Sequence, residues 1–433
     1  MPDGSRLSRT AKCFIVVGGI GVVAIAVVFA LRTAFSWKDA AVLAATSLQS
    51  FVVLSFVHYT IFRRNDLLSW DAIIKLFAAG FLIAVPAAFV AEGLLENICG
   101  FVAWLFGRLL STVVGSSSNG FLDGQSLVLW VLAEVVYAYA VSALVEELCK
   151  YYTYRLIQHP DLYPTDSTLD REQDRSRGRS GKESDESTLA TRESFIEIFI
   201  SLDGDGESSR RDKTDMERSY RQKAMAITTG MISVAVGFAC AENFLYVFIL
   251  AGTSSSGDAD ASYQADIAGA WLVLLCRTIF PVHALSAALQ STNMIRRCVE
   301  QPAKRQEPKI RVRRIVLPAV VLHGSFDAVL DGLAVFNEYA GITGSTDGGR
   351  GGGEAQGSND SSSIKHLVSN IVAWVGVSVI MLVGLAWYIR EYSQQQLRLK
   401  ALEDRKRKKM RRQWVAGPSS TRIIKCPSKI LVI

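Results

Sequence analysis

Four short groups of ionisable residues lie in stretches of this chain that are otherwise apolar. The first group is Glu146-Glu147 with Lys150, which places the lysine one helical turn from both carboxylates, at i,i+4 and i,i+3. Two neighbouring carboxylates can share a proton, so that one of them can act as a base near neutral pH. The spacing therefore indicates acid–base chemistry. The alternative is a helix end in the headgroup zone, where these charges cost little.

The second group centres on Glu242, which lies well inside the apolar stretch 224–251. An unpaired carboxylate there would be very costly, so we expect a partner, either in a structural hydrogen bond between helices or in a functional site. The third group is His283, which follows Pro281 closely. Because proline removes a backbone donor and kinks a helix, we expect space to open beside this histidine.

The fourth group is His323 with Asp327, followed by Asp331. The three residues are spaced four apart and therefore share one face of a helix. A histidine four residues before a carboxylate suits two metal ligands, or a histidine that is oriented by the carboxylate. An interhelical ion pair is the structural alternative.

Together, these groups place carboxylates and imidazoles on four separate apolar segments. A charged side chain in the middle of a membrane helix costs about 2.5–3.5 kcal/mol, and such residues usually face the bundle interior and mark a functional site. Side chains of these types can activate water in an apolar cavity. The same types also form proton or metal pathways, so the chemistry alone does not choose between the two.

The apolar segments that carry these groups are long enough to cross a membrane. The chain has 433 residues, 49% of them hydrophobic and 20% charged. Apolar residues gather in runs near or above 18 residues, the length that spans a bilayer core of roughly 30 Å. This pattern excludes a soluble enzyme, a disulfide scaffold, a coiled coil and an outer-membrane barrel. We predict an all-α, polytopic transmembrane helix bundle. The eight predicted spans are 13–31, 39–62, 76–94, 126–148, 224–251, 267–290, 315–337 and 366–390.

A ninth apolar segment, 96–115, carries Glu96 and Arg108, and we interpret it as re-entrant or interfacial. The loop charges give the orientation, because Lys and Arg gather on the cytosolic side of membrane proteins. From residue 126 onward, loops poor in Lys and Arg alternate with loops rich in them. We therefore expect both termini in the cytosol, which requires an even number of spans.

The four groups, in this order, resemble the PrsW family of intramembrane proteases, which is related to the CAAX-prenyl-protease-like membrane peptidases. Each motif alone is unspecific, but four in order on separate predicted helices are specific. The resemblance covers residues 66–337, and the chain departs from the family at Gln290, where a glycine is usual. The matching motifs are Glu146-Glu147-x-x-Lys150, Gly237-Phe238-Ala239-x-x-Glu242-Asn243 with Tyr246, Arg277 with Pro281 and His283, and His323-Gly324-Ser325-Phe326-Asp327.

The resemblance implies an endopeptidase that cuts membrane-anchored proteins. One glutamate of the Glu146–Glu147 pair would be the general base on the hydrolytic water, and the histidines would stabilise the oxyanion or bind a metal. Both a Zn²⁺ mechanism and a metal-free glutamate mechanism stay open. The implied catalytic residues are Glu146, Glu147, Lys150, His323 and Asp327. The implied ligands, if Zn²⁺ is used, are Glu242, His283 and His323, with a fourth position open for water.

We expect three parts in the chain. Residues 1–65 form a membrane anchor region, and 66–390 form the PrsW-like protease domain, with a polar inserted loop at 158–222 and a Gly/Ser-rich loop at 340–363. Residues 391–433 form a basic cytosolic tail, in which 9 of the 15 residues from Arg398 to Arg412 are Lys or Arg. The tail would bind anionic lipids or only set the topology.

The expected setting is a multi-pass protein of a eukaryotic endomembrane, with its site in the cytosolic half of the bilayer and no nucleic-acid partner. Two other functions fit the same residues. One is a proton- or metal-translocating transporter. The other is a catalytically silent membrane scaffold of the same fold.

Overall fold

The described part of the chain is entirely helical in this computed structural model. The structure describes residues 11–13, 15–16, 18–20, 37–60, 68–114, 131–157, 219–253, 275–304, 310–345 and 359–415, and these contain no strand. The α-helices are α2 (Trp37–Thr60), α3 (Trp70–Ala79), α4 (Val85–Val114), α6 (Leu144–Leu156), α10 (Tyr220–Thr253), α12 (Val282–Ile295), α13 (Gln301–Lys304), α14 (Val312–Ser345) and α15 (Asn359–Val415). Three π-helical segments continue such helices, at Gly80–Ala84, Ala138–Ala143 and Arg296–Glu300.

Within the described residues, four helices are long and apolar enough to cross a membrane, so the protein is a multi-pass membrane protein. They are Trp70–Phe101, Tyr220–Tyr246, Val312–Leu333 and Ile371–Lys408. These four confirm the spans expected at 76–94, 224–251, 315–337 and 366–390. The spans expected at 39–62, 126–148 and 267–290 stay predictions, although parts of each are helical, and 13–31 lies mostly outside the described residues.

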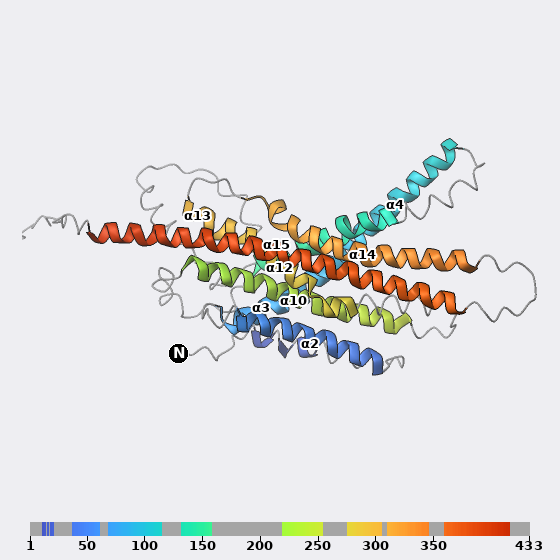
Figure 1. Ribbon diagram of the computed structural model, residues 1–433, viewed down its shortest axis with the longest axis horizontal. Helices are drawn as coiled ribbons and strands as arrows, with labels where there is room; N and C mark the ends of the chain where they lie inside the picture. The colour runs from blue at the N-terminus through green and yellow to red at the C-terminus, as the bar shows by residue number, and fades with distance from the viewer. Residues whose placement is uncertain are drawn as a thin grey trace, which may run out of the picture.

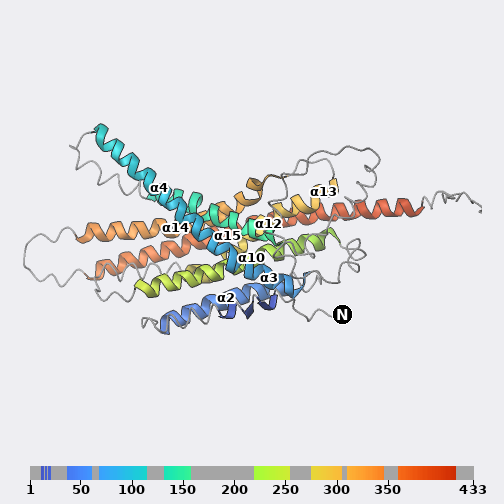
Figure 2. The same cartoon turned by 180° about the vertical axis from the view of Figure 1, so that it is seen from behind.

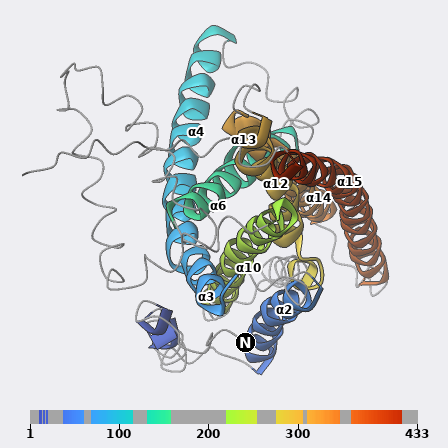
Figure 3. The same ribbon diagram turned by 90° about the vertical axis from the view of Figure 1, so that its left-hand side faces the viewer.

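The bundle is built around α10. This helix packs against α2, α3, α4, α6, α12 and α15, and it is buried along most of its span, whereas the outer helices expose one side (Figure 3). The largest buried cluster includes Leu76, Tyr151, Ile227 and Met294, which come from four different helices. Helix α15 runs along the long axis of the molecule and packs against both α14 and α10 (Figure 1).

Segment 96–115 differs from its prediction. Helix α4 continues without a break from Val85 to Val114, so this segment prolongs the preceding span instead of forming a separate re-entrant piece. No proline interrupts it, and the side chain of Asn97 bonds to the Gly93 carbonyl oxygen at 2.6 Å without breaking the helix. Beyond the bundle core, α4 diverges from its neighbours (Figures 1 and 2).

Two helix irregularities aim the polar groups inward. The π-helical segment Ala138–Ala143 comes directly before α6, and its extra residue turns the following helix by about 100° relative to a regular α-helix. Glu146 and Glu147 follow it and are both buried. The second irregularity is the predicted break at Pro281, where helical residues 275–279 end and α12 begins at Val282. His283 therefore lies in the first turn of α12.

Helix α10 and the segment Trp70–Ala84 approach each other closely at two glycines. A Cβ atom on Gly237 would overlap the Phe77 carbonyl oxygen, and a Cβ atom on Gly80 would overlap the Val234 carbonyl oxygen. Only glycine allows two backbones to come this near, as is common where membrane helices pack. This contact holds the helix that carries Glu242 against its neighbour.

The substitution Gly237→Ala is expected to destabilise the protein by about 1–3 kcal/mol, because the added methyl group must push two helix backbones apart. The measurement is the thermal unfolding midpoint of purified protein in detergent. Gly93→Ala is the matched control, since no atom lies within 4 Å of a Cβ at that position. Equal midpoints for the two variants would show that the glycine contact does not support the bundle.

Candidate metal and catalytic centre

The acidic pair and the lysine of the first motif form a buried ion cluster on α6. Lys150 Nζ lies 2.8 Å from Glu147 Oε1 and 3.2 Å from Glu146 Oε2. All three side chains are buried, and Glu147 is 0% exposed. The lysine therefore contacts both carboxylates, as the i,i+3 and i,i+4 spacing predicts.

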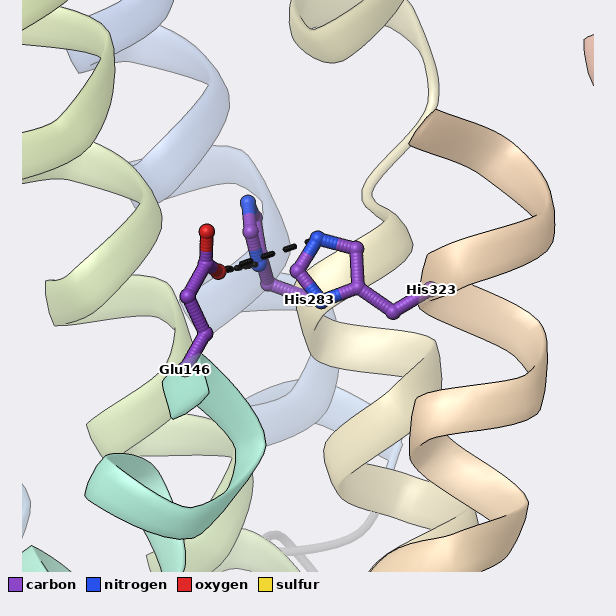
Figure 4. A group of neighbouring side chains, drawn as sticks. All are labelled: Glu146, His283 and His323. Atoms are coloured by element: carbon purple, nitrogen blue, oxygen red, sulfur yellow. Dashed lines mark ion pairs between the residues drawn. The ribbon is translucent and has the colours of Figure 1, made fainter. Parts of the chain in front are cut away.

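Two histidines from other helices complete this cluster. The rings of His283 on α12 and His323 on α14 are 4.7 Å apart and nearly perpendicular, at 80°. Glu146 Oε2 lies 3.8 Å from His283 Nδ1 and 3.7 Å from His323 Nε2 (Figure 4). Among the described residues, Glu146, His283 and His323 form the buried group whose ligand atoms all lie within 4.8 Å of one another and could hold a metal ion.

The protonation of the two rings follows from their partners. Lys150 Nζ lies 2.9 Å from His283 Nδ1, and because an ammonium can only donate, Nδ1 carries the lone pair. His323 Nδ1 lies 3.1 Å from Glu147 Oε1, so Nδ1 of a neutral ring donates and Nε2 carries the lone pair. In each neutral ring, the lone pair is on the nitrogen that is nearer Glu146.

The residues present fit a metal ion such as Zn²⁺. Nε2 of His323 is buried and makes no hydrogen bond. Two imidazoles and one carboxylate are a donor set of catalytic zinc sites, where bonds of about 2.0–2.2 Å put neighbouring ligand atoms roughly 3.4 Å apart. The separations of 3.7 and 3.8 Å from Glu146 Oε2 are close to that value. Glu146 Oε2 and His283 Nδ1 also contact Lys150 Nζ, at 3.2 and 2.9 Å, so a bound cation would replace the ammonium at these two atoms.

Glu242 lies behind His283 and not beside Glu146. Its Oε2 is 2.9 Å from His283 Nε2, on the opposite side of the ring from Glu146, and its Oε1 pairs with Arg277. The candidate ligand set therefore differs from the predicted Glu242–His283–His323 in its carboxylate, which is Glu146. Sequence spacing could not distinguish the two carboxylates, because both lie on helices that face the same histidines.

Asp327 and Glu147 support the centre from two sides. Asp327 Oδ2 lies 3.3 Å from His323 Nε2 and accepts a hydrogen bond from the Ser142 hydroxyl at 3.4 Å. Glu147 accepts hydrogen bonds from Lys150 and from the Ser286 hydroxyl, the latter at 3.0 Å. Every predicted site residue is thus in or next to one cluster.

Three polar residues in or near the cluster carry no role in the sequence-based prediction. Gln290 is fully buried and donates to the main-chain oxygen of Glu147 at 3.1 Å and to its Oε2 at 3.4 Å. Ser286 is one turn before it on the same helix face. Glu92 on α4 is half-buried and within electrostatic range of Glu146 and Glu242. Glu92 is ionisable inside a predicted span, so the criterion that found Glu242 could have found it.

Gln290 is also the position where the chain departs from the family pattern. A glycine there could not make these two side-chain bonds. The departure therefore lies in the centre itself and adds a polar contact to Glu147.

The described residues thus form an all-helical bundle that encloses a carboxylate–histidine centre, in a multi-pass membrane protein. Residues 216–343 match the family model described as PrsW family intramembrane metalloprotease, so the chain carries a domain of this peptidase family. The match confirms the resemblance over a shorter range than the predicted 66–337. It includes Glu242, His283 and His323, whereas Glu146 and Glu147 precede it. Searches of curated proteins and of solved structures found no match.

Proposed function

We propose that the protein is an intramembrane endopeptidase that hydrolyses peptide bonds of membrane-anchored proteins. The observation that carries this proposal is the buried group of Glu146, His283 and His323, in a chain with a PrsW-family domain. Hydrolysis inside a membrane needs water, a base and a group that stabilises negative charge, all shielded from lipid. The cluster supplies the base and the charged group.

Glu146, His283 and His323 would hold the metal of this family, which we propose is Zn²⁺. A zinc ion supplies Lewis acidity, because it makes water easier to deprotonate and polarises a carbonyl group. Glu147 orients His323 through Nδ1, and Glu242 contacts Nε2 of His283. Such contacts behind an imidazole fix its orientation and its tautomer.

The proton acceptor in this proposal is Oε1 of Glu146. Its described contact is the Ser142 hydroxyl at 3.5 Å, so this oxygen has an unused lone pair. Oε1 would take a proton from the attacking water and later deliver it to the leaving amine. Glu147 is less suited as the base, because it already accepts hydrogen bonds from Lys150, Ser286 and Gln290.

Lys150 is placed to balance negative charge during the reaction. Its ammonium group contacts both glutamates and lies 4.3 Å from the centre of the Phe238 ring. The ring covers one side of the ammonium and excludes water from it. In such a low-dielectric surrounding, a fixed positive charge stabilises a developing oxyanion more strongly than it would in water.

The expected topology, location and domain bounds are also part of the proposed function. They are eight spans, both termini in the cytosol, an endomembrane location and a protease domain over 66–390. Helix α15 crosses the boundary expected at residue 390 without a break, and Arg398 pairs with the buried Glu300 at 3.0 Å. The first turns of the basic tail thus pack on the bundle. The basic residues beyond them would contact anionic lipids.

Cleavage by purified protein is the test of the proposed function. The protein is reconstituted in liposomes with single-span test substrates and compared with a Glu146→Gln/Glu147→Gln double variant. Products from the wild type alone are the expected result, and metal analysis of the same sample identifies the ion. No product, together with proton or metal flux that depends on the same residues, would support the transporter instead. If the wild type shows neither cleavage nor flux, the catalytically silent scaffold is the remaining candidate.

Gln290→Met is expected to lower the cleavage rate about ten- to hundredfold, because a hydrogen bond to a charged group contributes roughly 1.5–3 kcal/mol. Methionine keeps the side-chain volume but cannot donate to Glu147. Gln395→Met is the matched control, since Gln395 is another buried glutamine, donating to the Thr292 main-chain oxygen at 3.0 Å away from the centre. Equal rates for both variants would mean that Gln290 only fills space.

A further inference from the structure

Arg277 joins two carboxylates that come from different helices. The residue is 7% exposed. One terminal nitrogen of its guanidinium group pairs with Glu242 Oε1 on α10, and the other lies 3.2 Å from Asp327 Oδ1 on α14. The planar fork of the guanidinium group thus holds α10 and α14 at a fixed separation.

Each of these carboxylates uses its other oxygen to contact one of the two histidines. Glu242 Oε2 lies 2.9 Å from His283 Nε2, and Asp327 Oδ2 lies 3.3 Å from His323 Nε2. The five side chains therefore form a continuous chain of contacts with Arg277 at its middle. Nε2 of His283 carries a proton that faces Glu242, whereas Nε2 of neutral His323 has none, so Asp327 limits the position of the His323 ring by contact and charge. A shift of the guanidinium group would move both carboxylates and thereby change the positions open to both imidazoles.

Arg277 is itself held by two further contacts. Its main-chain oxygen accepts a hydrogen bond from Gln49 of α2 at 2.8 Å. Its guanidinium carbon lies over the Tyr246 ring, 4.7 Å from the ring centre, which is within the range of a cation–π contact. The residue also lies four positions before Pro281, in the helical segment 275–279 that ends before α12 begins.

We propose that Arg277 is a positioning residue, which sets the relative orientation of His283 and His323 through Glu242 and Asp327. The proposal rests on the proposed function, because the two imidazoles matter as ligands and as part of the reaction site. Lysine cannot take over this role, since a point charge on a flexible stem does not pair with two carboxylates in a fixed plane.

The experiment compares the wild type with Arg277→Lys, using Co²⁺ as a spectroscopic probe of the centre. Co²⁺ absorption reports the geometry of its ligands and needs no substrate. For Arg277→Lys, we expect an altered Co²⁺ spectrum and a ten- to hundredfold weaker Co²⁺ affinity, which is the usual effect of changing a residue that orients a metal ligand. We also expect a lower kcat at a nearly unchanged KM. Arg297→Lys is the matched control, because Arg297 contacts the Tyr151 hydroxyl at 3.1 Å away from the histidines.

A second variant separates positioning from folding. Arg277→Ala leaves two buried carboxylates without their cation, which can unfold the protein, so its thermal unfolding is measured first. If Arg277→Ala folds, added guanidinium ion is expected to restore part of its cleavage rate and part of the wild-type Co²⁺ spectrum. The same addition is expected to leave Arg297→Ala unchanged. Where it does not fold, Arg277→Lys decides alone.

Two outcomes overturn different proposals. An active wild type whose Arg277→Lys variant matches it in spectrum, affinity and kcat would overturn the positioning role and leave the proposed function intact. A wild type that neither cleaves substrate nor binds Co²⁺ would overturn the proposed function and the positioning role together.

Discussion

Replacing Glu146 with glutamine is expected to reduce substrate cleavage about 10²- to 10⁴-fold, the range over which a positioned general base acts. Glutamine has the shape of glutamate but cannot take a proton from water. Its carbonyl oxygen is also a weaker metal ligand than a carboxylate, so the loss should lie at the upper end of this range. The measurement is the initial rate with a single-span substrate in liposomes.

The control for Glu146→Gln is Glu300→Gln. Glu300 is also buried, at 3% exposed, and its carboxylate pairs with Arg398 at 3.0 Å, but it contacts no residue of the cluster. Both variants lose one buried ion pair, and only Glu146→Gln loses the proposed base. Similar rates for the two variants would contradict the role of Glu146, and the base would then have to be sought in Glu147 or Asp327.

Replacing His323 with glutamine is expected to remove the bound metal and to abolish measurable cleavage. The glutamine amide reaches the position of Nε2 and not that of Nδ1, so the contact with Glu147 is lost as well, and the amide offers no imidazole lone pair to a metal. Changing a residue behind a ligand costs 10- to 100-fold in metal affinity, so losing a ligand should cost more than about 100-fold. The measurements are metal content after dialysis and cleavage rate at several Zn²⁺ concentrations.

Thr228→Val is the control for His323→Gln. Thr228 forms a buried hydrogen bond with Ser291 at 3.0 Å between α10 and α12, outside the cluster. Its loss should affect stability alone. Full metal content and full activity in His323→Gln would exclude His323 as a ligand and remove the main support for a metal centre at this position.

The sequence predicts contacts within one helix well, because helical spacing is fixed. Lys150 reaches both glutamates as the i,i+3 and i,i+4 positions require, and His323 reaches Asp327 in the same way. Contacts between helices depend on how each helix is rotated about its axis. For that reason the spacing did not show that His283 presents one nitrogen to Glu146 and the other to Glu242.

Hydropathy predicts the helical class and the strongest spans, and charged residues within a long helix mislead the prediction of where that helix ends. Glu96 and Arg108 indicate a separate re-entrant or interfacial segment, yet α4 is one continuous helix past both positions because no residue there breaks it, which excludes a separate re-entrant piece. In the same way, charges near residue 390 indicate a boundary between domain and tail. Helix α15 passes this boundary because Gln395, Leu399 and Leu402 are buried against the bundle.

The two cations of the cluster determine its charge balance. Four carboxylates and two cationic side chains contact one another or the two histidines directly, so with neutral histidines their formal charges sum to −2. These residues are Glu146, Glu147, Glu242, Asp327, Lys150 and Arg277. One divalent cation would neutralise them, and so would two protons. In a medium of low dielectric constant, metal binding is therefore coupled to proton release, and the affinity for the metal falls as the pH falls.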